Sequence, residues 1–131
     1  CSCDIPKDSA DSWNSIKQTG NLKVGVASVD NRSDHQVKSQ IKELNLLRQF
    51  ADLNAVKIQF KNDTETNLIE DLKQGRLHIV SGKFDKNTIW QDEAASSTTY
   101  DGSHVFLLPK GENELLYHLE EYLFKYKKDG Q

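Results

Sequence analysis

Residues 75–91, GRLHIVSGKFDKNTIWQ, join a short apolar run directly to a polar segment. The run RLHIVSG, residues 76–82, follows Gly75 and is typical of a buried strand. Between residues 83 and 99 no periodic pattern continues, so the sequence predicts a long loop after this strand. Loops that follow strands are where α/β proteins usually bind a ligand. The neighbouring segments indicate which kind of sheet the strand joins.

Strand-like and helix-like segments alternate along the chain. Besides residues 76–82, strands are predicted at residues 21–28 (NLKVGVAS), 55–60 (AVKIQF) and 104–109 (HVFLLP). Helices are predicted from Ser12 to Gly20, over residues 37–53, from a cap at Asp63 or Thr64 to Gly75, and over residues 113–127. This alternation predicts an α/β domain with a largely parallel sheet of about four to five strands and helices on both faces.

Two of these helices carry a long apolar stripe that is predicted to pack on the sheet. In the helix over residues 37–53 the stripe consists of Val37, Ile41, Leu44, Leu47, Phe50 and Ala51. In the last helix it consists of Leu115, Leu116, Leu119, Tyr122, Leu123 and Tyr126.

The composition excludes several classes of function. A chain of 131 residues is the size of one domain, and 36% hydrophobic with 28% charged residues is typical of a globular protein. The net charge is −3 and the lysines are scattered among acidic residues, so the sequence predicts no nucleic-acid partner. No apolar run approaches the about 18 residues of a membrane helix. Any link to a membrane must therefore be an added anchor.

Both cysteines, Cys1 and Cys3, lie at the start of the sequence and precede a polar stretch. One intervening residue would strain a disulfide between them. A leading cysteine followed by a polar linker, here residues 1–11, resembles a mature bacterial lipoprotein. We therefore expect a lipidated Cys1 and a lipid-anchored protein on the periplasmic or extracellular face of a bacterial envelope. The alternative is that the position of Cys1 is accidental, and Cys3 has no assigned role.

Three segments together resemble one family. They are SWNSIKQTGNLKVGVAS (residues 12–28), IKELNLLRQFADLNAVKIQF (41–60) and NLIEDLKQGRLHIVSG (67–82). They are similar to the first lobe of extracellular solute-binding proteins of family 3, the polar amino-acid type. ELNLLRQFA, residues 43–51, is closer to the related regulatory domain of membrane-bound lytic transglycosylases. The resemblance implies the type-2 periplasmic binding protein fold.

The sequence departs from the family pattern where the ligand would bind. The family continues with a Thr and an Arg that clamps the ligand carboxylate; Thr88 matches the first, but Gln91 stands in place of the Arg. SSTTY, residues 96–100, replaces the family's FS.PY. His78 replaces the aspartate of the third strand, and Asn45 replaces an acidic residue of the second helix.

The largest departure is in length. Residues 103–130 resemble the segment that in the family returns from an inserted second lobe, but here they follow the predicted loop directly. The resemblance therefore implies a single three-layer lobe over residues 12–131, with the second lobe absent. One lobe offers half of a site, whereas pockets usually enclose about 70% or more of a small ligand.

Loops beyond the carboxyl ends of parallel strands are the predicted ligand-binding mouth of the lobe. The candidate ligand-binding residues are Ser28, Asp30, Asn31, Asp63, Thr64, Ser81, Lys83, Thr88 and Gln91. Trp90, Tyr100 and Tyr117 are candidate anchors for a partner, because exposed aromatic side chains often supply binding energy. The alternative for Trp90 and Tyr100 is that both fold inward over the sheet edge.

The sequence predicts no enzyme and therefore no catalytic residue. It contains no Gly-x-Ser-x-Gly motif and no phosphate-binding loop. The four histidines lack the close spacing of a zinc motif, so neither a metal nor a cofactor is expected. His78 is expected to pack inside the fold, and Asp85, Asp92 and Glu93 are interpreted as solvated loop charges.

Two functions follow from these observations. The first is a lipid-anchored, non-enzymatic envelope protein that uses one solute-binding-like lobe as a binding or protein-interaction module. The second is a receptor for an amino acid or a cell-wall fragment, linked to transport or cell-wall regulation and working as a dimer.

Overall fold

The computed structural model describes residues 12–27, 34–85, 87–99 and 104–129, without the side chains of residues 12, 34–40, 83 and 126–129. Several residues with predicted roles therefore lie outside the described part: Cys1, Ser28, Asp30, Asn31, Tyr100 and the side chains of Val37, Lys83 and Tyr126. None of the described helices is long and apolar enough to span a bilayer.

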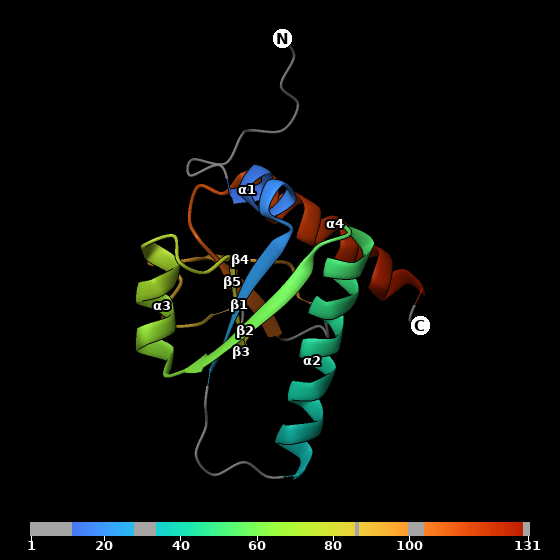
Figure 1. Cartoon of the computed structure of the whole chain (residues 1–131). Helices are drawn as coiled ribbons and strands as arrows, with labels where there is room; N and C mark the ends of the chain where they lie inside the picture. Colours follow the sequence, from blue (N-terminus) through green and yellow to red (C-terminus); the bar gives the residue numbers. More distant parts are fainter. Residues whose placement is uncertain (1–11, 28–33, 86, 100–103, 130–131) are drawn as a thin grey trace.

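Four helices and five strands make up the described chain (Figure 1). In order they are α1 (Ser12–Thr19), β1 (Asn21–Ala27), α2 (Asp34–Leu53), β2 (Lys57–Asp63), α3 (Glu65–Lys73), β3 (Ile79–Asp85), β4 (Ala95–Ser96), β5 (His104–Leu108) and α4 (Asn113–Asp129).

The strands form one mixed sheet in the order β2-β1-β3-β5-β4. β1 pairs in parallel with β2 on one side and with β3 on the other. β5 runs antiparallel to β3, and β4 runs antiparallel to β5, so four of the five strands share one direction. β5 follows β4 in the chain and pairs antiparallel with it, and the described residues between β3 and β5 contain no crossover helix of the kind that joins parallel strands. The predicted α/β class, with a mostly parallel sheet and helices on both faces, is confirmed.

Two apolar clusters cover the two faces of the sheet, which gives three layers. On one face α1, α2 and α4 pack against alternate residues of β1, including Leu22, Val24 and Val26. On the other face Leu68, Ile69 and Leu72 of α3 pack against Ala27 and residues of β3 and β5. Gly25 of β1 leaves room for this second layer, because a Cβ there would lie 2.7 Å from Leu77 and 2.8 Å from Leu68.

Several predicted boundaries shift. β2 and β3 both end later than predicted, so residues 61–63 and 83–85 are strand and not loop. β4 forms within the predicted loop. The last residues of β2 are polar and were not predicted as strand, because β2 lies at the edge of the sheet. Most of its side chains are exposed there, so no apolar alternation marks the strand.

The buried stripe of α2 also differs from the prediction. Ile41, predicted to be buried, is 53% exposed, whereas Glu43 is 1% exposed. The buried apolar residues of the described part of the helix are Leu46, Leu47, Phe50 and Ala51, with Leu44 at the margin. The Glu43 carboxylate thus lies on the buried side of the helix, where it meets the hydroxyl of Ser81 on β3.

Candidate ligand-binding mouth and a second pocket

The carboxyl ends of β1, β2 and β3 lie at one edge of the sheet, the lower edge in Figure 1. Ala27 at the end of β1 is in register with Asp63 at the end of β2, and Val26 is in register with Ser81 of β3. The structure therefore brings Asp63, Thr64 and Ser81 to the same end of the sheet. This end is the predicted mouth.

Asp63 and Thr64 are both used to start α3. Asp63 Oδ1 accepts hydrogen bonds from the Thr64 backbone N–H (2.8 Å) and from Asn67 Nδ2 (2.9 Å), and Thr64 Oγ1 accepts one from the Asn67 N–H (3.3 Å). These hydrogen bonds lower the pKa of Asp63, because they stabilise its carboxylate. The bond from the Asn67 side chain has the larger effect and the bond from the Thr64 N–H the smaller one. Thr64 is the N-cap, which confirms one of the two capping residues expected for this helix.

Ser81 points away from solvent into the layer beneath α2. Its Oγ donates a 2.9 Å hydrogen bond to Glu43 Oε1, and both side chains are buried. This pair explains why Glu43 faces the sheet. A residue predicted to meet a ligand therefore contacts the protein's own core.

Thr88, Trp90 and Gln91 lie on the turn that follows β3. Thr88 is buried and its Oγ1 accepts a 3.4 Å hydrogen bond from the Trp90 N–H. The Trp90 ring packs at the margin of the α3-side cluster, and its indole Nε1 donates a 2.9 Å hydrogen bond to Glu65 Oε1. Gln91 is exposed, whereas Trp90 is partly buried and Thr88 is buried.

Asp85 at the end of β3 lies 3.8 Å from His104 Nε2 at the start of β5. Its side chain is exposed, as expected for a solvated loop charge. His78, in contrast, is buried, and its Nδ1 accepts a 2.9 Å hydrogen bond from the Lys23 N–H. The pKa of His78 is lowered to about 4, mainly because the ring is buried and to a lesser extent because Lys23 is positively charged. Within the described residues no group of three or more His, Cys, Asp or Glu side chains is placed to hold a metal.

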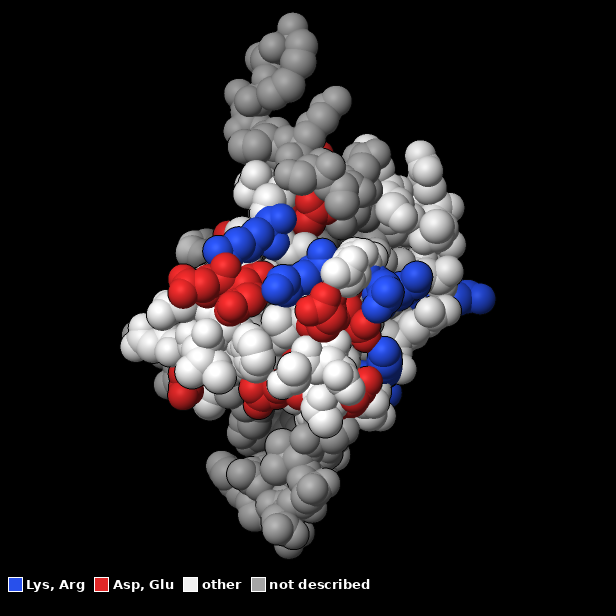
Figure 2. All heavy atoms as spheres, turned by 90° about the vertical axis from the view of Figure 1, so that its left-hand side faces the viewer, with Lys and Arg blue, Asp and Glu red and all other residues white. Residues whose placement is uncertain are grey.

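The face on the α3 side carries charges of both signs next to one another (Figure 2). Asp71 of α3 is their centre, because it pairs with Lys61 of β2 and, at 3.3 Å, with Arg76. The hydrogen bond between Asp71 and Lys61 raises the pKa of Lys61 and lowers that of Asp71. These charges are paired within the chain, which is typical of a solvated face.

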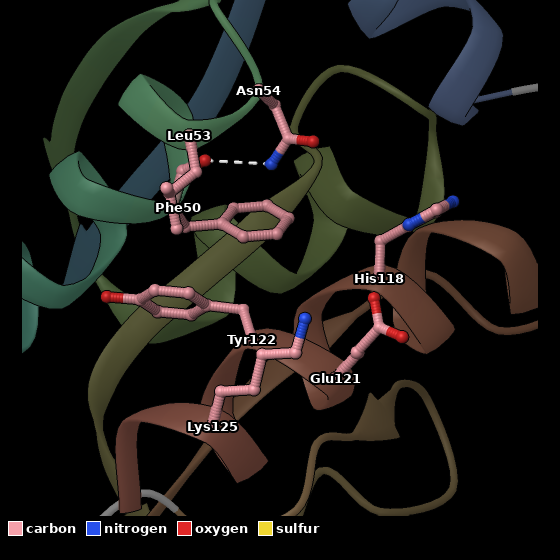
Figure 3. A pocket seen from close by; sticks show the side chains of 7 residues that line it. All are labelled: Phe50, Leu53, Asn54, His118, Glu121, Tyr122 and Lys125. Atoms are coloured by element: carbon pink, nitrogen blue, oxygen red, sulfur yellow. Dashed lines mark hydrogen bonds between the residues drawn. The ribbon is translucent and has the colours of Figure 1, made fainter. Parts of the chain in front are cut away.

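A second pocket lies far from the mouth, where the end of α2 meets α4 (Figure 3). Its volume is about 220 Å³, below the roughly 300–1,000 Å³ of common small-molecule sites. The side chains around it are Phe50, Leu53, Asn54, His118, Glu121, Tyr122 and Lys125. Sequence reasoning assigned Phe50 and Tyr122 to the core, and no sequence pattern marked the pocket.

Aromatic packing builds the wall behind this pocket. Trp13 of α1 stacks on His118 with ring centroids 4.1 Å apart, and Phe50 lies 5.5 Å from Tyr122. Tyr117 meets the edge of His118 and donates a hydrogen bond to Glu121, but remains 42% exposed. Leu53 of α2 is 73% exposed, and Phe124 of α4 is 68% exposed. We use the name α2–α4 surface for three exposed apolar side chains of these two helices, Leu53 at the end of α2 and Tyr117 and Phe124 on α4.

Known structures share this architecture. Domain 1 of TmArgBP in its arginine-bound form aligns with a TM-score of 0.70 and 16% identity over 85% of this chain and 97% of that chain. The ancestral amino acid-binding protein AncCDT-1, a precursor of cyclohexadienyl dehydratase, aligns with a TM-score of 0.72 and 13% identity over 91% and 94%. An amino acid ABC transporter substrate-binding protein from Streptococcus pneumoniae, bound to L-arginine, aligns at 0.71 and 11% over 91% and 93%. No protein-family model matches the sequence, and no curated protein does.

These alignments define the class of fold. The chain has the α/β fold of one lobe of a periplasmic binding protein, as the sequence resemblance implied. The match to an isolated domain spans nearly all of that domain.

Proposed function

We propose that this chain is a non-enzymatic binding module of the bacterial envelope whose mouth no longer clamps a small solute. The observation that carries the proposal is the state of the predicted ligand-binding side chains. Ser81 is bonded to Glu43 under α2, Asp63 and Thr64 hold the start of α3, and Thr88 is buried against Trp90. A ligand that bound these side chains would first have to break their internal hydrogen bonds. The free energy lost in breaking them offsets the free energy that the ligand's own contacts would contribute to binding.

The exposed Gln91 supports the same proposal. In the family that the sequence resembles, this position holds an Arg that binds the ligand carboxylate. A glutamine can hydrogen-bond to a carboxylate, but it supplies neither the fixed charge nor the two parallel donors of a guanidinium.

The α2–α4 surface is the proposed contact for a protein partner. Leu53, Tyr117 and Phe124 are exposed there, and large exposed apolar side chains commonly mark interaction sites. We further propose that residues 12–131 form one binding lobe, that residues 1–11 are a linker, and that a lipid on Cys1 holds the lobe at the membrane. Labelled palmitate incorporated by the natural chain but not by Cys1→Ala would support the anchor; equal labelling would contradict it.

Calorimetry and thermal-shift assays with free amino acids, muropeptides and oligosaccharides test the state of the mouth. We expect an unchanged melting temperature with each compound. Saturable micromolar binding of a free amino acid would contradict the proposal.

Site-directed photo-cross-linking in native envelopes tests the partner surface. A photoreactive residue at position 124 should give one discrete cross-linked product, whereas the same residue at the exposed position 66 of α3 should not. Equal labelling from both positions would contradict a specific partner at the α2–α4 surface.

The second candidate is an amino-acid receptor. It is favoured by the arginine-bound domain 1 of TmArgBP, in which a single domain is described with its ligand. This candidate predicts that L-arginine or another amino acid raises the melting temperature by mass action. Gln91→Ala should then weaken that response, whereas Asp92→Ala on the same exposed turn should leave it unchanged.

A further inference from the structure

β2 is a long strand at the edge of the sheet. It pairs with β1 along all seven of its residues, and no described strand covers its other side. In Figure 1 β2 lies at the front of the sheet, with α3 on one side and α2 on the other. An unpaired edge of this length is a template for another strand.

The hydrogen-bonding groups on that outer side can be assigned. The Lys57 N–H donates a 2.7 Å hydrogen bond to the Gly20 carbonyl, so the backbone groups of Lys57 face β1. Because these groups alternate in direction along a strand, those of Ile58, Phe60 and Asn62 face outward.

The sequence of β2, KIQFKND, is complementary to itself when two copies run antiparallel with Phe60 opposite Phe60. Ile58 then lies opposite Asn62, and all outward-facing backbone groups find partners. On the other face Lys57 lies opposite Asp63, and Lys61 lies opposite Gln59. Opposite charges directly across an antiparallel pair are stabilising.

We propose that two copies of this chain associate through antiparallel pairing of their β2 strands, forming one continuous ten-stranded sheet. The line along which the two β2 strands pair is called the seam. At each end of the seam the exposed side chain of Lys57 from one copy and Oδ2 of Asp63 from the other form a charge pair. Oδ2 of Asp63 lies 3.7 Å from Lys61 Nζ of the same strand but accepts neither of the two hydrogen bonds that start α3, since both go to Oδ1. Phe60, over which the Arg48 guanidinium lies at 5.3 Å, is at the centre.

This dimer goes beyond the proposed function and does not depend on it. Antiparallel pairing directs the two mouths in opposite directions, so neither mouth closes over the other. It therefore differs from a receptor in which facing mouths enclose one solute.

Sedimentation equilibrium of the full chain tests the dimer, with Asn62→Pro and Asn62→Ala as a matched pair. Proline removes the outward N–H of Asn62 while the bonds to β1 remain, because those come from neighbouring residues. Because each copy carries the substitution, the dimer loses two hydrogen bonds between the β2 strands. The dimer dissociation constant of Asn62→Pro should therefore rise about tenfold or more. Asn62→Ala keeps the N–H and should dimerise like the natural chain.

Charge reversal provides an independent test. Lys57→Glu places a carboxylate opposite Asp63 at both ends of the paired β2 strands, so the dissociation constant of the dimer should rise. The rise should be smaller in high salt, because salt screens the repulsion between the two carboxylates. Lys73→Glu, an equal change on α3 away from the edge, should not raise it. A natural chain that stays monomeric at about 1 mM would overturn the proposal. Equal dissociation constants for Asn62→Pro and Asn62→Ala, measured with circular dichroism confirming that both fold, would also overturn it.

Discussion

Ser81 Oγ in β3 and Glu43 Oε1 in α2 are joined by a buried hydrogen bond of 2.9 Å. The pair connects the sheet to its longest described helix through a carboxylate that loses its water on folding, and the Ser81 hydroxyl offsets part of that loss. Buried charged groups are tolerated when they are hydrogen-bonded, so the hydroxyl helps to fix the rotation of α2 about its axis. The same bond withdraws Ser81 from the mouth.

Ser81→Ala should lower the free energy of unfolding by about 1–3 kcal/mol, because it removes a donor from a buried acceptor. Urea denaturation measures the change. Ser15→Ala, an exposed position of α1, should stay within about 0.5 kcal/mol of the natural chain. If the two variants lost the same amount, the Ser81–Glu43 bond would not be a net source of stability.

His78 should make the fold sensitive to mild acid. Its pKa is about 4 in the folded chain against 6.5 for an ordinary histidine, so between these values the unfolded chain binds a proton that the folded chain does not. The contribution of His78 to the free energy of unfolding is therefore fully present above pH 6.5. It falls by about 3 kcal/mol as the pH drops toward 4. Denaturant titrations across this range measure the loss.

His78→Asn keeps an acceptor near the Nδ1 position but cannot take up a proton, so it should flatten the decline between pH 6.5 and 4. His104→Asn at the start of β5 should leave the decline in place. Asp63 and Asp71, whose pKa values are lowered, lose their contribution only below their ordinary value of 3.8, so they act in a more acidic range. A decline unchanged by His78→Asn would refute the assignment.

Gly82→Ala should destabilise the fold by about 1–3 kcal/mol through overpacking. A Cβ at this position would lie 2.8 Å from the Ala27 Cβ and 3.1 Å from the Phe84 ring. The cost should shrink when the substitution is made in an Ala27→Gly background, since the closest atom is then gone. Thermal unfolding of all four combinations measures this coupling; additive effects would show that the contact relaxes freely.

Trp90 should contribute to stability through its ring more than through its N–H. Trp90→Phe removes the donor to the exposed Glu65 and should cost about 0.5–1 kcal/mol. Trp90→Ala also removes the packing on the α3-side cluster and should cost about 2 kcal/mol, less than the roughly 3–5 kcal/mol of a fully buried Trp. Unfolding monitored by the fluorescence of the remaining Trp13 gives both values. An unchanged stability in Trp90→Ala would instead favour a ring held out for a partner.

The apolar periodicity of the sequence predicted the elements that are buried on a clear face. Leu22, Val24 and Val26 alternate and form one side of β1, and Gly75 ends α3 with a positive φ of 79°. The order of these elements was sufficient to predict a three-layer α/β lobe, since few topologies accommodate it.

Polar residues in regular structure could not be placed in the same way. Ser81 looks like a loop residue until its partner Glu43 is known, and that partner lies on another element. Lys61 and Asp63 belong to an edge strand, where water replaces the apolar neighbours that create a pattern. β4 is two residues long and is defined by its pairing with Leu107 and Leu108, which no local pattern reveals.

The unequal cover on the two faces of the sheet has a consequence for local opening. α1, α2 and α4 protect one face, whereas α3 and the turn after β3 protect the other. α3 has nine residues, and a helix of that length is marginal without its tertiary contacts. Its amides are therefore expected to exchange with solvent hydrogen through detachment of this layer alone. The amides of β1, which lies between two strands and beneath both layers, should exchange only when the whole lobe unfolds.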